Sequence, residues 1–146
     1  MKTAAGILKS KSDQAVYSIE PAASVLDAIK LMALKGIGAL LVMEGEKIVG
    51  IVTERDYARK VILRGRASKE TPVEVIMTAE VLYVRPDHTS EECMALMTEN
   101  RLRHLPVIDD GKLLGMLSIG DLVKDIIAEQ QFLIDQMEHY IHGDRA

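Results

Sequence analysis

Aromatic residues are scarce in this sequence: among 146 residues there are no Trp, one Phe and four Tyr. Hydrophobic residues still make up 48% of the chain, so we expect a packed core built from Val, Ile, Leu, Met and Ala. Proteins that bind single-stranded nucleic acid stack the bases on aromatic side chains. The shortage of aromatic residues therefore argues against that class of function.

Positive charge is not in excess either. The chain has 18 Lys and Arg residues against 22 Asp and Glu residues, which gives a formal net charge of −4. Nucleic-acid-binding domains usually carry a surplus of basic residues, so we expect no nucleic-acid partner. An anionic ligand would have to be held by positive charge placed locally at its site.

Cysteine is limited to Cys93, which excludes an internal disulfide framework and a four-thiolate zinc site. We interpret Cys93 as a small core residue. Long apolar runs are also lacking, since no stretch approaches the roughly 20 apolar residues that a membrane-spanning helix needs. The first residues lack the apolar run of a signal peptide. We therefore expect a cytoplasmic protein with no membrane partner.

Motifs for catalysis are missing as well. The sequence has no P-loop, no dinucleotide-binding glycine pattern and no Ser-His-Asp or Cys-His arrangement. We therefore expect a protein that is not an enzyme. Asp135, His139 and His142 have a helical spacing that could hold a metal ion. A solvated helix end explains these residues more simply, so no metal site is predicted.

An internal repeat organises the chain. Residues 16–62 align with residues 81–127 without a gap, at a shift of 65 positions. Identical pairs recur along the alignment, such as Pro21 with Pro86 and Asp56 with Asp121. Upstream, Thr3–Ser10 resembles Thr71–Thr78 at a shift of 68. A duplication of this length predicts two equivalent units that share one design.

Each repeat predicts the order strand, helix, strand, strand, helix, and hence an α/β (α+β) fold. Capping boxes start the first helices, and Gly-containing turns join the paired strands into hairpins. In the first repeat the expected elements are Val16–Ile19, a helix from Ser24 to Lys35, Ala39–Met43, Ile48–Val52 and a helix from Thr53. In the second they are Val81–Val84, a helix from Thr89 to Asn100, Leu105–Ile108, Leu113–Leu117 and a helix from Ser118. We expect domain boundaries at 1–66, 67–128 and 129–146, the last being a helical extension.

The last helix is expected to run from Asp121 to Ile141, because this stretch has no Gly or Pro. Most of an apolar stripe follows its length, formed by Leu122, Ile126, Leu133, Met137 and Tyr140. Such a stripe either packs back on the same chain or pairs with another subunit. We favour the second interpretation, because the repeats leave no further face to cover.

Two hydroxyl–carboxylate pairs, Thr53 with Asp56 and Ser118 with Asp121, predict ligand sites. Each pair follows an apolar strand with a glycine three residues before the hydroxyl, so we expect the backbone to approach a ligand closely there. Each pair also lies at the carboxyl end of a strand, where ligands gather in α/β arrangements. The pairs at Ser24 and Thr89 are interpreted as ordinary caps.

The paired pattern resembles tandem CBS domains, also called a Bateman module. The resemblance covers nearly the whole chain and leaves only the end of the last helix unexplained. Its signatures are Ile19–Pro21, Ile37–Val42 and Gly50–Asp56 in the first repeat, and Val84–Pro86, Arg103–Asp109 and Gly115–Asp121 in the second.

This resemblance implies a regulatory module with clefts between the repeats that bind AMP, ADP, ATP or sometimes NAD or S-adenosylmethionine derivatives. The Asp of each pair would accept hydrogen bonds from ribose hydroxyls, while the Thr or Ser hydroxyl and helix N–H groups face phosphate. One site would comprise Thr53, Arg55 and Asp56, with the base near Tyr17, Ser18, Ile19, Ile37 and Ala39. The other would comprise Ser118 and Asp121, with the base near Tyr83, Val84, Leu102 and His104, and with Arg103 reaching phosphate.

Of the two sites we expect the first to bind more tightly. Gly36, Gly38 and Ala39 leave room for a flat base there, and Arg55 adds a positive charge. The leading hypothesis is a non-catalytic sensor of adenosine ligands that acts as a homodimer and controls an unidentified protein. The alternative is a dimerising interaction scaffold without a physiological nucleotide.

Overall fold

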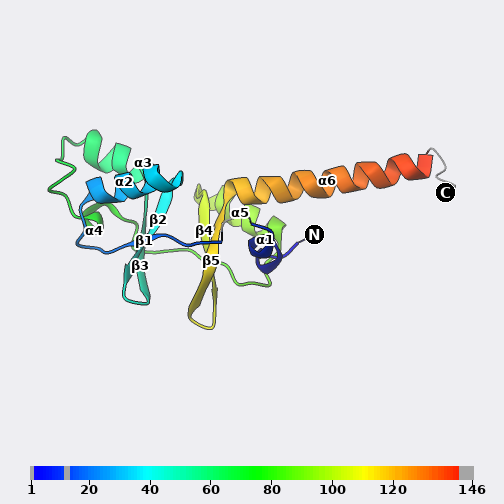
Figure 1. The fold of residues 1–146 in the computed structure, drawn as a ribbon, viewed down its shortest axis with the longest axis horizontal. Coiled ribbons are helices and arrows are strands. Elements are labelled where there is room, and N and C mark those ends of the chain that lie inside the picture. Colours follow the sequence, from blue (N-terminus) through cyan, green and yellow to red (C-terminus); the bar gives the residue numbers. More distant parts are fainter. Residues whose placement is uncertain (1, 12–13, 142–146) are drawn as a thin grey trace. The chain divides into compact units, whose positions relative to one another are not determined.

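The computed structural model describes residues 2–11 and 14–141 as short strands and helices (Figure 1). The predicted mixed α+β fold is confirmed. In chain order its elements are α1 (Ala4–Ser10), β1 (Ser18–Ile19), α2 (Val25–Lys35), β2 (Ala39–Glu44), β3 (Lys47–Thr53), α3 (Glu54–Tyr57), the π-helix η1 (Ala58–Ile62), α4 (Val73–Ile76), α5 (Ser90–Asn100), β4 (His104–Asp109), β5 (Lys112–Ser118) and α6 (Ile119–Ile141).

The chain forms two compact units. The first unit is Val16–Val81, and the second unit combines Met1–Ala15 with Leu82–Ala146. This grouping differs from the expected boundaries, which placed the N-terminal segment with the first repeat and residues 67–81 with the second. Contacts, rather than the order of segments along the chain, decide which helix completes which repeat.

In the first unit, β1 pairs in parallel with β2, and β2 pairs antiparallel with β3. Val25, Ala28 and Met32 line the buried side of α2. The core around this sheet is aliphatic, as the composition predicted; its fully packed members are Val25, Ala28, Met32, Leu40, Val42, Val52, Val61, Val73 and Ile76. Helix α2 ends where Gly36 adopts a positive φ of 66° and Ile37 donates its N–H to the Met32 carbonyl, which is the hydrogen-bonding pattern of a glycine C-cap.

In the second unit, β4 and β5 form the corresponding hairpin. The expected strand Val81–Val84 is reduced to a single parallel bridge between Val84 and Val107. Proline explains the difference. In the first unit the Leu41 N–H donates to the Tyr17 carbonyl at 3.3 Å, but the position equivalent to Leu41 is Pro106, which has no N–H to donate.

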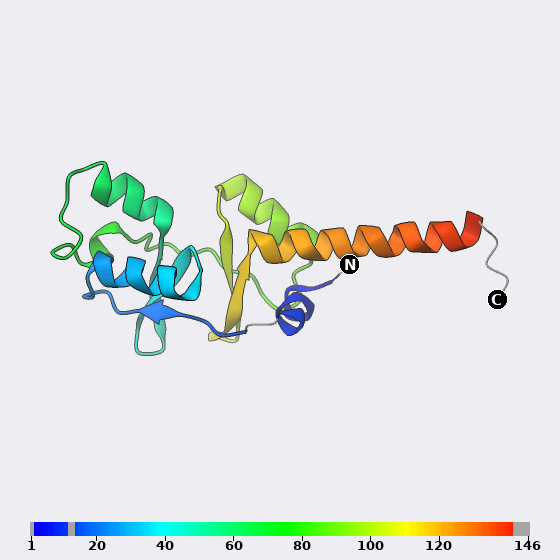
Figure 2. The same ribbon diagram turned by 45° about the horizontal axis from the view of Figure 1, so that its top comes forward.

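Helices α1 and α4 are equivalent parts of the two units. In the first unit, the N–H groups of Val73 and Glu74 donate to the carbonyls of Ala23 and Pro21 at 2.8 and 3.0 Å. In the second, the N–H groups of Ala4 and Ala5 donate to the carbonyls of His88 and Pro86 at 2.7 and 3.0 Å. These bonds relate the two helices by 69 positions, so the expected shift of 68 was wrong by one. Helix α1 thus packs on β5 and α6 (Figure 2).

The two strand glycines leave room for these helices rather than for a ligand. A Cβ on Gly50 would lie 2.6 Å from Met77 Sδ and 2.9 Å from the Thr78 carbonyl oxygen. A Cβ on Gly115 would lie 2.8 Å from Cδ2 of Leu8. The expectation that these glycines allow backbone to approach a ligand was therefore wrong. Their role is packing, against Met77 and Thr78 just after α4 in one unit and against α1 in the other.

The helices that follow β3 and β5 end very differently. After η1, Gly65 takes a positive φ of 66°, its N–H donates to the Ile62 carbonyl, and Arg66 N–H donates to the Val61 carbonyl. This is a Schellman stop. The position equivalent to Gly65 is Gln130, and α6 continues to Ile141, which confirms the predicted long helix. None of the helices among the described residues is long and apolar enough to cross a membrane.

Candidate functional site

The first candidate site lies where β3 passes into α3. Thr53 is opposite Ala39 in the antiparallel register of β3 and β2, and the Glu54 N–H donates to the Gly38 carbonyl at 3.1 Å. The structure therefore brings Thr53 and Asp56 to the same end of the sheet as Ala39 and the neighbouring Ile37. This grouping lies entirely within the first unit.

A reciprocal capping box fixes the Asp56 side chain. Its Oδ2 accepts from the Thr53 N–H at 3.0 Å and from the Thr53 hydroxyl at 3.1 Å, while the Asp56 N–H donates to Thr53 Oγ1 at 3.1 Å. The other oxygen, Oδ1, lies 3.1 Å from Lys60 Nζ. Lys60 also donates to the Ile76 carbonyl at 2.9 Å. Asp56 is thus held in one orientation, with its charge balanced by a lysine on the following turn.

The residues predicted to enclose the base are divided between two strands. Tyr17, Ile19 and Ile37 each pack, partly buried, against the core of the first unit, whereas the Ser18 side chain is exposed. The Lys35 ammonium lies 5.1 Å from the centre of the Tyr17 ring, a cation–π distance. Arg55 is exposed, and among the described residues its guanidinium forms no ion pair.

The second candidate site repeats this arrangement within the second unit. Ser118 is opposite His104 in the register of β5 and β4, and the Ile119 N–H donates to the Arg103 carbonyl at 2.8 Å. Asp121 Oδ2 accepts from the Ser118 N–H at 2.8 Å, and the Asp121 N–H donates to Ser118 Oγ at 3.1 Å. The structure therefore brings four of the predicted residues together.

Three other predicted residues lie around this group with different exposure. Val84 is fully buried and forms two hydrogen bonds on either side of Val107: its N–H donates to the Pro106 carbonyl and its carbonyl accepts from the Ile108 N–H, each at 2.9 Å. Leu102 packs partly buried against the core of the second unit. Tyr83 is 51% exposed, so its ring is available to a ligand rather than committed to the core.

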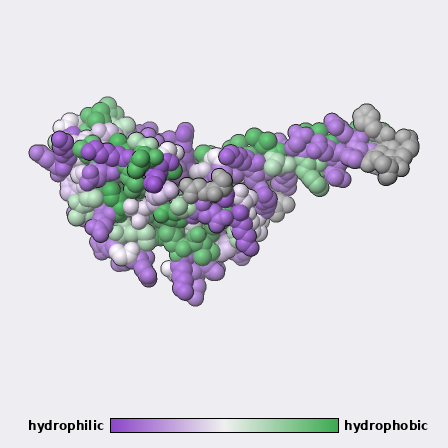
Figure 3. Space-filling model, viewed as in Figure 1, coloured by the Kyte–Doolittle hydropathy of each residue, from purple (hydrophilic) through white to green (hydrophobic). Residues whose placement is uncertain are grey.

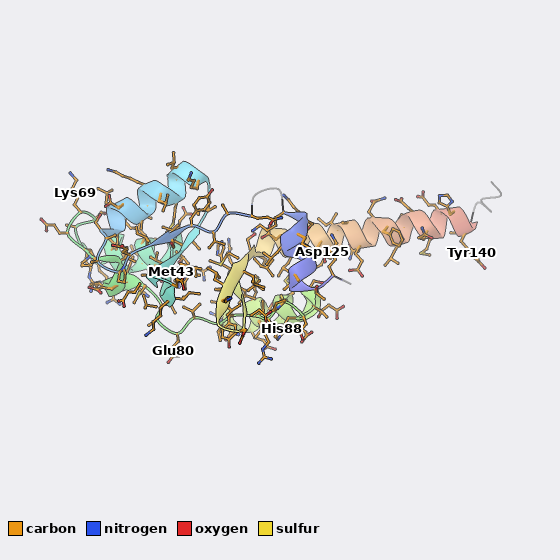
Figure 4. The ribbon with its side chains drawn as sticks, turned by 60° about the horizontal axis from the view of Figure 1, so that its bottom comes forward. Met43, Lys69, Glu80, His88, Asp125 and Tyr140 are labelled. Atoms are coloured by element: carbon orange, nitrogen blue, oxygen red, sulfur yellow. The ribbon has the colours of Figure 1, made fainter. Side chains whose placement is uncertain are left out.

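A lysine from the N-terminal segment completes the second site. Lys11 Nζ lies 3.0 Å from Asp121 Oδ2 and donates to the Met116 carbonyl at 2.8 Å. The position equivalent to Lys60 in this repeat is Asp125, which cannot balance the charge of Asp121. Asp125 is itself buried beside α1, with Oδ1 3.7 Å from Lys2 Nζ and no hydrogen-bond partner for Oδ2 among the described residues (Figure 4). The N-terminal segment thus supplies the cations that this repeat lacks.

Two ionisable groups of the second site, Asp121 and His104, have pKa values shifted from their ordinary values. Burial raises the pKa of Asp121, but the hydrogen bond from the Ser118 N–H and the Lys11 ammonium outweigh it, so that the pKa lies below its ordinary value. Burial lowers the pKa of His104; Lys11 and Arg103 act in the same direction and Asp121 opposes them. Near neutral pH Asp121 is therefore a carboxylate and His104 a neutral imidazole.

The two remaining caps differ from the candidate sites in their surroundings. Thr89 and Glu92 form a full capping box, but its hydrogen bonds are exposed to solvent. Ser24 accepts from the Asp27 N–H at 3.1 Å. The side chains of Asp56 and Asp121 are only 13% and 17% exposed, and each has a lysine partner. Partial burial with a cation is what separates a candidate ligand carboxylate from a plain cap.

The helix N–H groups offer fewer donors than expected. The Glu54 and Ile119 N–H groups donate to the carbonyls of Gly38 and Arg103, which directly precede β2 and β4, and the Asp56 and Asp121 N–H groups donate to the capping hydroxyls. In the described part of the chain this leaves Arg55 and Gly120 as the first-turn positions with an uncommitted N–H. Phosphate recognition would accordingly depend mainly on basic side chains.

Lys11 and Lys60 were missed by the sequence prediction. Asp56 and Lys60 are four residues apart, and this spacing could have predicted the ion pair between them. No local pattern connects Lys11 to a site 105 residues away at Met116. Across the residues that the structure describes, no group of three His, Cys, Asp or Glu side chains could hold a metal ion; His142 lies outside the described residues.

Comparison with known proteins gives a consistent match. The family model "CBS domain" matches residues 12–63 and 73–128. The Arabidopsis thaliana protein "CBS domain-containing protein CBSX3, mitochondrial" is 44% identical over 125 residues, covering 82% of this chain and 61% of the relative. "CBS domain-containing protein YhcV" of Bacillus subtilis is 32% identical over 107 residues, covering 73% of this chain and 76% of the relative. The chain also spans only 22% of the longer Arabidopsis relative CBSCBSPB5.

Solved structures agree with this match. A putative signal-transduction protein with CBS domains from Burkholderia ambifaria is 62% identical, with a TM-score of 0.86, over 88% of this chain and 96% of the other. A hexameric CBS-CP12 protein from bloom-forming cyanobacteria is 32% identical, with a TM-score of 0.76, over 98% of this chain and 85% of the other. Both the sequence and the arrangement of its elements are therefore shared with CBS-domain proteins.

Proposed function

Since the chain belongs to the CBS-domain family, with two CBS domains in tandem, we propose that it is a regulatory module that binds an adenosine-containing ligand such as AMP, ADP, ATP or NAD. One observation carries the proposal: both repeats hold a partly buried Asp in a fixed orientation, with carboxylate lone pairs beyond those used by its cap. A carboxylate has about four acceptor positions; in Asp56 the cap takes two and Lys60 a third, which leaves one for a ribose hydroxyl.

The charges around each Asp indicate which part of the ligand each side chain would bind. Asp56 and Asp121 would accept the ribose hydroxyls, because carboxylates bind donors and repel phosphate. Arg55 and Arg103 are exposed and would bind the phosphates, as a guanidinium offers a bidentate match to them. The neutral imidazole of His104 suits contact with the base rather than with phosphate. The first site remains the one that we propose to bind more tightly.

Thermal stability against a panel of AMP, ADP, ATP, NAD and S-adenosylmethionine tests the proposal. A ligand present at 100 times its dissociation constant should stabilise the chain by about 2.7 kcal/mol. Asp56→Ala should weaken the stabilisation while costing about 1 kcal/mol through the lost cap. Glu92→Ala is the matched control, since it removes a cap carboxylate outside both sites. If no ligand shifts the transition, the sensor proposal is wrong.

We also propose that the chain works as a homodimer, with an unidentified protein as its regulatory target. The apolar residues in the second half of α6 are exposed, including Leu133 at 54%, Met137 at 62% and Tyr140 at 88%. A related CBS-CP12 protein is described as hexameric. The same exposure favours the second candidate function, an interaction scaffold without a nucleotide. A cytoplasmic location stays a prediction, and one relative is named as mitochondrial.

A further inference from the structure

The end of η1 and the loop after it form an exposed basic surface. Residues 58–69 contain five Lys and Arg residues and no Asp or Glu. Lys60 is engaged with Asp56, but among the described residues the other four basic side chains have no ion pair or side-chain hydrogen bond. We define the basic surface as these four residues with the two exposed apolar residues between them: Arg59, Ile62, Leu63, Arg64, Arg66 and Lys69.

Apolar side chains lie in the middle of this basic surface. Ile62 is 56% and Leu63 is 78% exposed, so neither belongs to the core. Arg59 and Ile62 belong to the π-helix η1 and Leu63 caps its end, so the three residues lie within about one turn of one another. The Lys69 side chain points away from the elements around it (Figure 4). A surface that combines Arg with exposed aliphatic residues has the composition of a protein interface.

The second half of α6 presents the opposite charge. Residues 126–141 contain Glu129, Asp135 and Glu138 and no Lys or Arg. Ile134, Met137 and Ile141 are 49%, 62% and 69% exposed, and their spacing of three and four residues places them on one face. We define the tail surface as this face together with the three acids of the same stretch. Figure 3 shows hydrophobic and hydrophilic residues side by side along α6.

The two surfaces are diverged copies of one segment. At the shift of 65 positions, Arg64 corresponds to Glu129 and Arg66 to Gln131. Gly65 ends the first copy in a loop, whereas Gln130 lets the second copy continue as a helix. The same segment is therefore basic and ends in a loop in the first repeat, whereas in the second repeat it is acidic and continues as a helix. Neither surface packs against the core of its own unit.

We infer that the tail surface of one copy of this chain docks on the basic surface of a second copy. An amphipathic helix binds a partner through apolar residues three and four positions apart, and Ile62 with Leu63 offers it an apolar counterpart. Charge complementarity then sets partner and orientation: the acids of the tail meet four uncommitted basic side chains. Both halves of the contact are present in one chain, so a second copy is the occupant. This inference rests on the proposed self-association and is independent of the nucleotide.

Charge reversal tests the contact by sedimentation of the full chain at several concentrations. One variant carries R59E, R64E and R66E, and the other carries D135K and E138K. Each alone should self-associate at least about tenfold more weakly than the natural chain, since each exposed ion pair contributes roughly a two- to fivefold effect. Mixed in equal amounts, the two variants should associate again, because every tail then meets a surface of opposite charge.

The control variant carries K9E, K47E and K112E, which change the net charge by as much as R59E, R64E and R66E do, at exposed positions elsewhere. It should associate like the natural chain. A natural chain that stays monomeric up to about 100 µM would overturn the inference, and so would reversal variants that associate normally or fail to recover on mixing. A monomer that still gains stability from a nucleotide would overturn only the docking contact, whereas a dimer that ignores every nucleotide would overturn only the sensor proposal.

Discussion

Replacing Lys11 with Met should weaken the second unit and change the titration of Asp121. The substitution removes an ion pair of 3.0 Å to Asp121 Oδ2 and a hydrogen bond of 2.8 Å to the Met116 carbonyl. Hydrogen bonds to charged groups contribute about 1.5–3 kcal/mol. Because the Lys11 side chain is 24% exposed, solvent screens part of this contribution. We therefore expect the free energy of unfolding to fall by about 1–2 kcal/mol.

The pKa of Asp121 should rise in the same variant. Burial already raises it, and without Lys11 only the hydrogen bonds from Ser118 oppose burial. In the natural chain the depressed pKa contributes stability that is full above the unfolded value of about 3.9 and is lost as the pH falls through the folded pKa. The Lys11→Met variant should lose this acid-dependent stability.

Denaturant unfolding followed by circular dichroism, repeated between about pH 3 and pH 7, measures the loss of stability; carboxyl carbon NMR measures the pKa of Asp121 directly. Lys9→Met is the control, because it removes the same charge from an exposed position on α1. If Lys11→Met matched Lys9→Met in both stability and titration, the proposed clamp of the N-terminal segment on Asp121 would be refuted.

Two further substitutions test the packing and backbone of the repeats by the same unfolding measurement. Gly50→Ala should lower the free energy of unfolding by about 1–3 kcal/mol. Gly115→Ala should lower it less, because a new Cβ meets the Thr78 carbonyl in the first case and only a Leu8 side chain in the second. Equal losses for the two variants would contradict this reasoning. Arg101 has a positive φ of 54° at the end of α5, so Arg101→Gly should stabilise by about 1 kcal/mol, and a loss of stability would show that its side chain packs.

Local patterns were sufficient to predict helices α2, α5 and α6 and both hairpins, but not helices α1 and α4 or the π-helix η1. The Gly45 turn joins β2 to β3, and Asp110 with Gly111, both at positive φ, joins β4 to β5. Capping residues placed the starts of α2 and α5 correctly. These features depend on residues within a few positions of one another, so their spacing in the sequence carries the information.

Long-range contacts were not predictable in the same way. The shortened strand at Val84 results from Pro106 in a neighbouring strand, and the packing of α1 on the second repeat results from hydrogen bonds to Pro86 and His88. The cation beside Asp121 comes from the other end of the chain. Each depends on which segments meet in space, and the repeat pattern alone does not specify that.

In the proposed function, Asp56 and Asp121 recognise a ribose. Titration calorimetry with AMP and with 2′,3′-dideoxy-AMP, on the natural chain and on Asp56→Ala/Asp121→Ala, tests it most directly. Lost hydrogen bonds to a carboxylate predict roughly ten- to hundredfold weaker binding of the dideoxy compound by the natural chain, and no preference in the double variant. Equal binding of both compounds by the natural chain, or an unchanged preference in the variant, would contradict the claim.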